Sequence, residues 1–193
     1  MSENLDNYFL ARPNDPILMR PTQKFDFENP PMDPEELANQ LLTVMAGQGG
    51  IGLSANQVGL PYSVFVIHGD PFACFNPMIV DVSEETADLE EGCLTFPGLY
   101  VTVTRPKHIR LRFTTIRGNV ETQKFTGMTA RIIQHEMDHL EGKLFFNRVS
   151  KYHRDKAFRK HNLFLRHPER FQKKDIVRTD TSTVPQYLSP QTF

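Results

Sequence analysis

The segment His135-Glu136-Met137-Asp138-His139 holds the residue types of a metal-dependent hydrolase. Two histidines at this spacing on a helix lie on the same face about one turn apart, so both imidazoles can bind one metal ion. Glu136 then points toward the open side of that ion. A bound metal ion lowers the pKa of water toward ~7, and a nearby carboxylate can take the proton and later return it to a leaving group. The spacing therefore predicts a mononuclear hydrolase with Glu136 as the acid/base.

The competing interpretation of this motif is a structural helix with two hydrogen-bonded histidines and a solvent-facing glutamate. Apolar residues occur on two sides of the expected helix, which indicates a buried position. They are Met128 and Ile132 on the histidine face, and Ile133, Met137 and Leu140 on the other. Burying a carboxylate and two imidazoles without partners is costly, whereas one metal ion compensates all three. Burial therefore favours the metal site.

An open catalytic metal site needs a third protein ligand. Metzincin peptidases place a histidine six residues beyond the motif, but that position is Phe145 here. The other downstream candidates fall in a charged C-terminal segment, a poor place for a dry pocket; they are His153, His161, His167 and Glu169. Cys93 is the better candidate, because its thiolate is a strong ligand for Zn or Fe and its glycine-flanked segment lets the backbone come close. Cys74 is expected to be a buried apolar residue.

The elements that must position these residues can be predicted from caps and periodicity. Three helices are expected: one that begins after the cap Asp33 and ends at Gly47, one over 127–141 capped by Thr126 and ended by Gly142, and a basic one over 150–166. Strands are expected over 63–67, 74–82, 100–104, 109–115 and 120–125, the last after a turn at Gly118-Asn119. The glycines and proline of 92–98 predict a shaped loop after the acidic stretch 84–91. The patch 17–19 suits an edge strand or a wrapping segment.

Three segments together resemble peptide deformylase: Gly50-Ile51-Gly52-Leu53-Ser54-Ala55-Asn56-Gln57, Glu91-Gly92-Cys93-Leu94-Thr95-Phe96-Pro97, and Gln134-His135-Glu136-Met137-Asp138-His139-Leu140-Glu141-Gly142. Their order and separations match that family, and the resemblance covers about residues 10–165. With the elements above it implies an α+β fold, in which antiparallel β-sheets wrap around a central buried helix that carries the HExxH motif, plus a C-terminal helix. We expect one domain over 1–166 and a polar tail over 167–193.

The resemblance also implies the roles of the site residues. The metal ligands are Cys93, His135 and His139, and the catalytic groups are Glu136, the Gln57 side chain and the Leu94 backbone N–H. The last two hold the developing oxyanion while hydroxide attacks the formyl carbon of an N-formylmethionyl peptide. The ion is one divalent metal, natively Fe(II) in this family, with Zn or Ni in many preparations. The substrate-binding residues are Ile51, Gly52, Gly92, Met128 and Ile132.

Two positions depart from the family's usual pattern: Ser54 stands where it has Ala, and Thr95 where it has Ser. We expect neither change to touch a metal ligand, the proton-transfer group or an oxyanion donor, so that only substrate preference is affected. Arg105 and Asp138 are expected to form an ion pair.

Three other interpretations stay open. Gly50-x-Gly52-x-x-Ala55 fits a dinucleotide-binding pattern, but such a pattern should follow a strand and open a helix, whereas here it follows a helix end. A peptidase could use the same metal chemistry in an extended cleft. The third is a non-enzymatic protein, either a structural metal module, which a fourth protein ligand closing the site would support, or an RNA-associated factor in which the basic helix matters most.

The charge distribution and the cysteine content predict the partners and the localisation of the protein. The net charge is −1, yet residues 151–178 hold ten Lys and Arg against three Asp and Glu. This basic segment is either a solvated face or a surface for a polyanion, and the family's C-terminal helix suggests transient ribosome contact. With two cysteines, no apolar leader and no long apolar run, we expect a soluble cytoplasmic protein without membrane contact.

Overall fold

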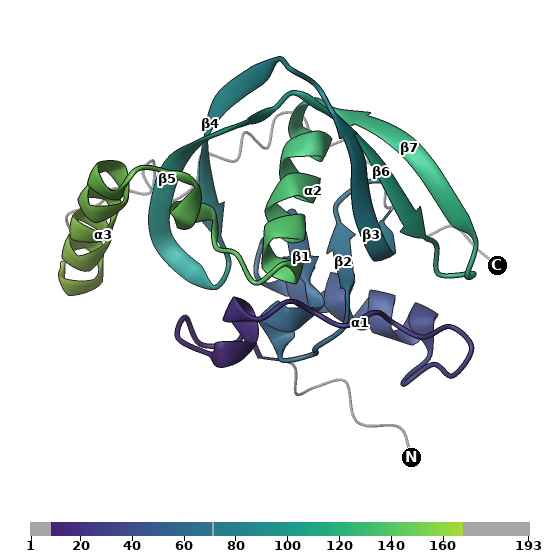
Figure 1. Cartoon of the computed structure of the whole chain (residues 1–193). Coiled ribbons are helices and arrows are strands. Elements are labelled where there is room, and N and C mark those ends of the chain that lie inside the picture. Colours follow the sequence, from purple (N-terminus) through teal and green to yellow (C-terminus); the bar gives the residue numbers. More distant parts are fainter. Residues whose placement is uncertain (1–8, 71, 168–193) are drawn as a thin grey trace, which may run out of the picture.

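The computed structural model describes residues 9–70 and 72–167 of the chain (Figure 1). Within these ranges the helices are α1 (Pro34–Gly47), α2 (Gly127–Leu140) and α3 (Lys151–Arg166). The strands are β1 (Gly52–Ser54), β2 (Val64–Ile67), β3 (Ala73–Val82), β4 (Thr86–Cys93), β5 (Phe96–Pro106), β6 (His108–Thr114) and β7 (Val120–Thr126). Short 3-10 helices cover Pro16–Met19, Ala55–Val58 and Phe145–Arg148.

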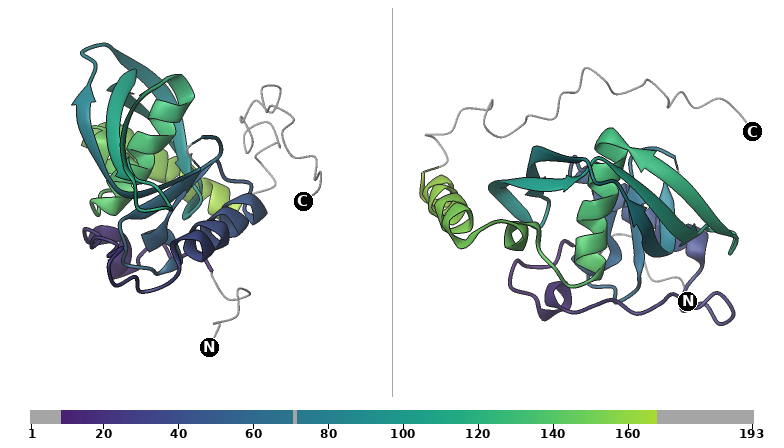
Figure 2. Two further views of the ribbon diagram at one scale, coloured as in Figure 1. Left: turned by 90° about the vertical axis from the view of Figure 1, so that its right-hand side faces the viewer. Right: turned by 45° about the horizontal axis from the view of Figure 1, so that its top comes forward.

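The strands form two antiparallel sheets around α2. Five strands pair in the order β1-β2-β3-β6-β7, and β4 pairs with β5 in a separate two-stranded sheet. Helix α2 lies between the two sheets, and α3 lies at the outer side of β5 (Figure 1; Figure 2). The expected α+β fold with a central helix and a C-terminal helix is confirmed.

The central position of α2 follows from alternation in the sheet and periodicity in the helix. In β6 every second side chain is buried, and these side chains pack on the apolar side of α2. The packed residues include Ile109, Leu111 and Phe113 of β6 and Ile133, Met137 and Leu140 of α2. The opposite side of α2 carries the polar and charged residues of the motif, so it must be covered by groups that can pair with them.

The predicted helix ends are confirmed in part. Asp33 accepts a hydrogen bond from the Glu36 N–H at the start of α1, and Ser150 accepts one from the His153 N–H at the start of α3. Thr126 occupies the cap position of α2, but its side chain makes no capping hydrogen bond.

The prediction of a loop over 92–98 was wrong. The acidic stretch forms β4, which continues to Cys93, and only Leu94 and Thr95 separate it from β5. The acidic residues are tolerated because β4 pairs with β5 alone and leaves most of its side chains in solvent. Gly98, at φ +80, gives β5 a backbone conformation that other residues rarely adopt.

The segment 17–19 is not a strand. Asp15 accepts a hydrogen bond from the Ile17 N–H, which begins the 3-10 helix Pro16–Met19, and Leu18 is fully buried against the residues around β5. The proline fixes the first turn in a helical conformation, which outweighs the β-propensity of the apolar patch.

Two further expectations concern the ends and the membrane. The C-terminal helix ends at Arg166 as expected, whereas the tail expected over 167–193 lies, apart from His167, outside the described residues. Within 9–70 and 72–167 we find no helix with the length and apolar character needed to cross a membrane.

Candidate metal centre

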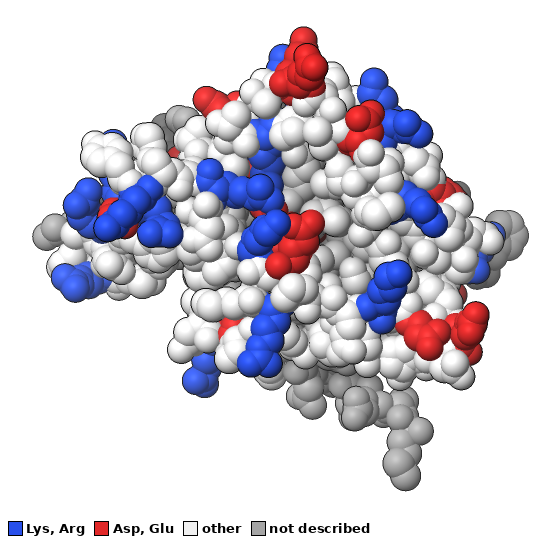
Figure 3. Space-filling model, viewed as in Figure 1, with Lys and Arg blue, Asp and Glu red and all other residues white. Residues whose placement is uncertain are grey.

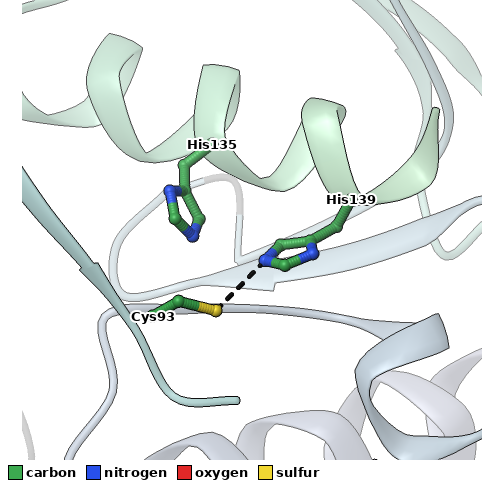
Figure 4. Close-up of side chains that lie close together, drawn as sticks. All are labelled: Cys93, His135 and His139. Atoms are coloured by element: carbon green, nitrogen blue, oxygen red, sulfur yellow. Dashed lines mark hydrogen bonds between the residues drawn. The ribbon is translucent and has the colours of Figure 1, made fainter. Parts of the chain in front are cut away.

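Three side chains from two elements converge beside α2. Cys93 lies at the end of β4, and His135 and His139 lie one turn apart on α2 (Figure 4). One ligand atom from each, the Cys93 Sγ and a ring nitrogen of each histidine, lies within 4.8 Å of the other two. The Cys93 Sγ is 3.3 Å from the His139 Nε2. The structure thus brings together the three residues that the sequence predicted as metal ligands.

Glu91 connects β4 to the first histidine. It points inward two residues before Cys93, and its Oε2 lies 3.1 Å from the His135 Nδ1. A carboxylate at one ring nitrogen fixes the ring and leaves the other nitrogen free for a metal ion. Glu91 therefore positions one ligand directly, and its strand carries another.

A buried ion network joins the β4-β5 hairpin to α2. Arg105 of β5 donates to both carboxylate oxygens of Glu91, at 2.7 and 2.8 Å, and to the Asp138 Oδ2 at 2.8 Å. The predicted pair of Arg105 and Asp138 is confirmed. Arg131 donates to the Glu91 Oε1 at 2.9 Å, and Arg148 donates to both oxygens of Asp138.

The network keeps Glu91 ionised. Burial alone would raise the pKa of Glu91, but hydrogen bonds from Arg105 and His135 and their charges lower the pKa to about 2. Burial also opposes the ionisation of Cys93, yet the adjacent His139 and His135 hold the pKa of its thiol well below the usual value. The pKa of His135 is lowered by burial, but hydrogen bonds with Cys93 and Glu91 outweigh this and raise it to about 10.

Glu136 lies on α2 beside β1 and has the opposite electrostatic environment. It is 3% exposed, and its Oε2 has no hydrogen-bond partner among the described residues. Burial raises the pKa of Glu136 to about 7, although the charges of His135 and His139 lower it. A buried carboxylate with an unused oxygen next to three metal-ligating side chains can exchange a proton with a bound molecule.

Gly52 of β1 lies against this carboxylate. A Cβ on Gly52 would stand 2.5 Å from the Glu136 Oε1 and 2.7 Å from the Ile132 side chain. Only glycine leaves the space between the strand and Glu136 open.

Gln57 lies in the 3-10 helix Ala55–Val58 and contacts the cysteine with its side-chain amide. Its Nε2 donates to the Cys93 Sγ at 3.3 Å and to the Thr95 Oγ1 at 3.0 Å. Its Oε1 accepts from the Ser54 N–H and from the Ser54 hydroxyl, both at 3.0 Å. An amide N–H aimed at the metal centre can stabilise negative charge there.

The remaining predicted residues lie around this centre. Leu94 follows Cys93 in the turn before β5, and its side chain packs near Gly50. Ile51 is exposed next to Gly52, and Met128 is 55% exposed in the first turn of α2, one turn before the partly buried Ile132. Gly92 lies beside the Tyr100 ring, which a Cβ on Gly92 would approach to 2.7 Å.

Besides Glu91, four polar residues near the centre were not foreseen by the sequence analysis. Ser54 and Thr95 both contact Gln57, so the expectation that they touch no oxyanion donor was wrong. Asn56 donates to the backbone carbonyl of His139 at 2.6 Å, and Arg131 binds Glu91. Ser54, Asn56 and Thr95 lie within the quoted motifs, which was a signal for these three residues; the sequence held no comparable signal for Arg131.

The dinucleotide-binding alternative is excluded by the local structure. Gly52 begins β1, and only the 3-10 helix Ala55–Val58 follows it, so the glycines do not connect a strand to an α-helix. A phosphate would therefore find no helix N-terminus of useful length there.

Comparisons with known proteins show the family of the chain. A family model described as polypeptide deformylase matches residues 9–155. A peptide deformylase of a Wolbachia species is 36% identical over an alignment of 151 residues, and the match covers 70% of this chain and 84% of the relative. A peptide deformylase of Synechocystis is 40% identical over an alignment of 121 residues. The match covers 59% of this chain and 65% of the relative, which is slightly less than two thirds of its length. The crystal structure of a plant peptide deformylase superposes with a TM-score of 0.76 at 31% identity, covering 88% of this chain and 95% of that chain.

Cys93 and Cys74 give a matched pair for testing the metal site. Cys93→Ala removes one of three donors, and we expect it to lower bound metal from about one ion per chain by at least about tenfold. Cys74→Ala removes a fully buried thiol outside the cluster and should leave the metal content unchanged. The measurement is metal content after gel filtration in a metal-free buffer. Equal metal content in the two variants would contradict the three-ligand site.

Glu91 should make an acid-sensitive contribution to stability. Its pKa in the folded chain, about 2, is below the usual 4.5, so the contribution is present above about pH 4.5 and is lost as the pH falls toward 2. We expect Glu91→Gln to lower the unfolding free energy by about 3 kcal/mol at pH 7, and by progressively less below pH 4.5, in urea titrations. Glu90→Gln, on the exposed face of the same strand, should change it by no more than about 0.5 kcal/mol. A Glu91→Gln effect that is independent of pH would disprove this role of the charge.

Proposed function

Because the chain belongs to the peptide deformylase family, we propose that it removes the formyl group from the N-terminal formylmethionine of nascent polypeptides and releases formate. The observation that carries this proposal is the convergence of Cys93, His135 and His139 next to a buried, unpaired oxygen of Glu136. Hydrolysis of a formamide needs an activated water, a group that moves its proton and donors for the developing oxyanion. The residues around the centre match these needs.

We propose that Cys93, His135 and His139 hold one divalent metal ion, natively Fe(II). The donor set fits, since a thiolate and two imidazoles bind Fe, Zn and Ni well, and the lowered pKa of Cys93 supplies the thiolate. When bound, such an ion supplies Lewis acidity and lowers the pKa of water. Among the described residues no fourth His, Cys, Asp or Glu joins the group, which supports a catalytic site with an open position over a closed structural one.

Glu136 is proposed to act as the acid/base. Its pKa near 7 allows the carboxylate to accept a proton from water and, protonated, to deliver it to the departing amine nitrogen of the methionine. The C–N bond of the formamide breaks, formate keeps the formyl carbon, and a free N-terminal methionine leaves. The burial of Glu136 excludes bulk water from this proton transfer.

Gln57 and Leu94 are proposed to hold the oxyanion through the Gln57 Nε2–H and the Leu94 backbone N–H. Both residues are next to Cys93. The Gln57 amide donates a hydrogen bond to the Cys93 Sγ, and Leu94 follows Cys93 in the sequence. Ile51, Gly52, Gly92, Met128 and Ile132 are proposed to bind the peptide and its methionine side chain. The exposed apolar surface of Ile51 and Met128 supports this role.

A peptidase acting on internal amide bonds is the second candidate, and substrate size separates the two. The site around Gly52 is narrow, with the strand directly against Glu136 and Ile132, which suits a formyl group better than an internal residue. We therefore favour the deformylase.

We further propose that the protein acts in the cytoplasm and meets nascent chains through α3. Both cysteines are free, which fits a reducing compartment. Lys and Arg side chains gather over α3 (Figure 3), which carries six of them and one Asp and has no buried residue. Such a surface attracts the phosphates of RNA.

The role of Glu136 is tested by formate release from formyl-Met-Ala-Ser with Fe(II)-loaded protein under anaerobic conditions, with Ni- and Zn-loaded protein in parallel. We expect Glu136→Gln to lower kcat by at least about 100-fold with the metal content unchanged, because the amide cannot transfer the proton. Glu141→Gln, an exposed residue just beyond α2, should retain wild-type activity. No formate from metal-loaded wild type would overturn the proposed function, and an active Glu136→Gln variant would overturn the role of Glu136.

The α3 contact is tested with two triple variants of equal charge change. Lys156→Glu/Arg159→Glu/Lys160→Glu reverses exposed charges on α3, and Arg110→Glu/Arg112→Glu/Lys124→Glu reverses exposed charges on β6 and β7. In co-sedimentation with purified ribosomes at low salt, we expect the first to weaken binding at least about tenfold and the second much less. Equal binding by both variants would refute a specific role of α3.

A further inference from the structure

The amide group of Gln57 is held at both ends by hydrogen bonds, and of the three residues that form them only Cys93 is a proposed metal ligand. At one end the Ser54 N–H and the Ser54 hydroxyl each lie 3.0 Å from the Oε1. At the other end the Nε2 lies 3.0 Å from the Thr95 Oγ1 and 3.3 Å from the Cys93 Sγ. Gln57 is 2% exposed and Ser54 is fully buried, so water does not compete for these bonds.

These contacts define which way the amide points. A backbone N–H can only donate, so the atom facing the Ser54 N–H must be the amide oxygen, and the NH₂ group must face Cys93. The hydroxyls of Ser54 and Thr95 can each donate or accept, so they adapt to this orientation and strengthen it. Two donors at the oxygen and two acceptors at the nitrogen leave the side chain little freedom to rotate.

We infer that Ser54 is a positioning residue for the deformylation reaction, which holds the Gln57 amide in the orientation that stabilises the oxyanion, with Thr95 as the second support. This inference rests on the proposed function. Preorganised donors stabilise a transition state because they need not reorient when charge develops. The Ser54 hydroxyl supplies one of the two bonds at the oxygen, so its removal should loosen the amide without abolishing the interaction.

Ser54 also contacts Glu136, and this gives a competing route for any effect on the rate. A route through Gln57 and a route through Glu136 differ in one respect. If Ser54 acts only by orienting Gln57, removing its hydroxyl should not change the rate further once the Gln57 amide has been removed.

The test is a double-mutant cycle with metal-loaded full-length protein and formyl-Met-Ala-Ser. We expect Ser54→Ala to lower kcat about threefold to tenfold, the effect of one neutral hydrogen bond, with KM and metal content unchanged. Gln57→Ala should lower kcat about 100-fold. The double variant Ser54→Ala/Gln57→Ala should match Gln57→Ala within about twofold. Ser83→Ala, which removes a partly buried hydroxyl that donates to the Glu85 carbonyl and accepts from the His108 N–H, serves as the control and should keep the wild-type rate.

The other end of the amide provides an independent measurement. Thr95→Ser keeps the acceptor for the Gln57 Nε2 and should keep kcat within about twofold, whereas Thr95→Val removes it and should lower kcat about threefold to tenfold.

The outcomes separate this inference from the proposed function. A wild type that releases no formate overturns both. An active wild type with an unchanged Ser54→Ala rate, or a Ser54→Ala effect that persists in full in the Gln57→Ala background, overturns the positioning role and leaves the deformylase assignment intact. Loss of metal or a raised KM in Ser54→Ala would show a structural role instead.

Discussion

The ion network of Glu91, Arg105 and Asp138 holds the two halves of the metal centre together. The cysteine lies on a two-stranded sheet that shares no strand with the main sheet, and the histidines lie on α2. Arg105 binds both Glu91, on the strand of the cysteine, and Asp138, on the helix of the histidines. The separation of the three donors therefore depends on a bridge of buried charges rather than on continuous sheet pairing.

A buried network of this kind is costly unless every member is paired. Ion desolvation can exceed the attraction between two charges, and the loss of one partner leaves the other charge unpaired. Here Arg105 has two carboxylates, Glu91 has two guanidinium groups and an imidazole, and Asp138 also binds Arg148. The same ion network explains why α2 can be buried on its polar side as well as on its apolar side. Hydrophobic contacts are not directional, so they would not fix the distance between the cysteine and the histidines as closely as these paired charges do.

The parts of the fold that sequence predicted are those that depend on local signals. The cap and proline at the start of α1, the alternation in β6 and the turn before β7 all act within a few residues, and the structure has them. The acidic strand β4 was missed because its own residues have low β-propensity. Its stability comes from pairing with β5. The convergence of Cys93 with the two histidines was predictable from the chemistry of the ligands, whereas the contacts of Ser54, Thr95 and Arg131 arise from tertiary packing and could not be derived from spacing.

Two buried carboxylates beside the same histidine differ in their protonation, and the difference comes from their neighbours. Glu91 faces two arginines and is held ionised, with a pKa of about 2. Glu136, one residue after His135, lies against Gly52 and forms no ion pair with an arginine among the described residues, and burial raises its pKa to about 7. Environments that push the pKa values of two carboxyl groups apart suit the groups to different tasks. A permanently charged group can orient its partners, and a group that titrates near neutrality can exchange protons. The arginines thus distinguish the two carboxyl groups by their position, since an arginine beside Glu136 would stabilise its ionised form and lower its pKa.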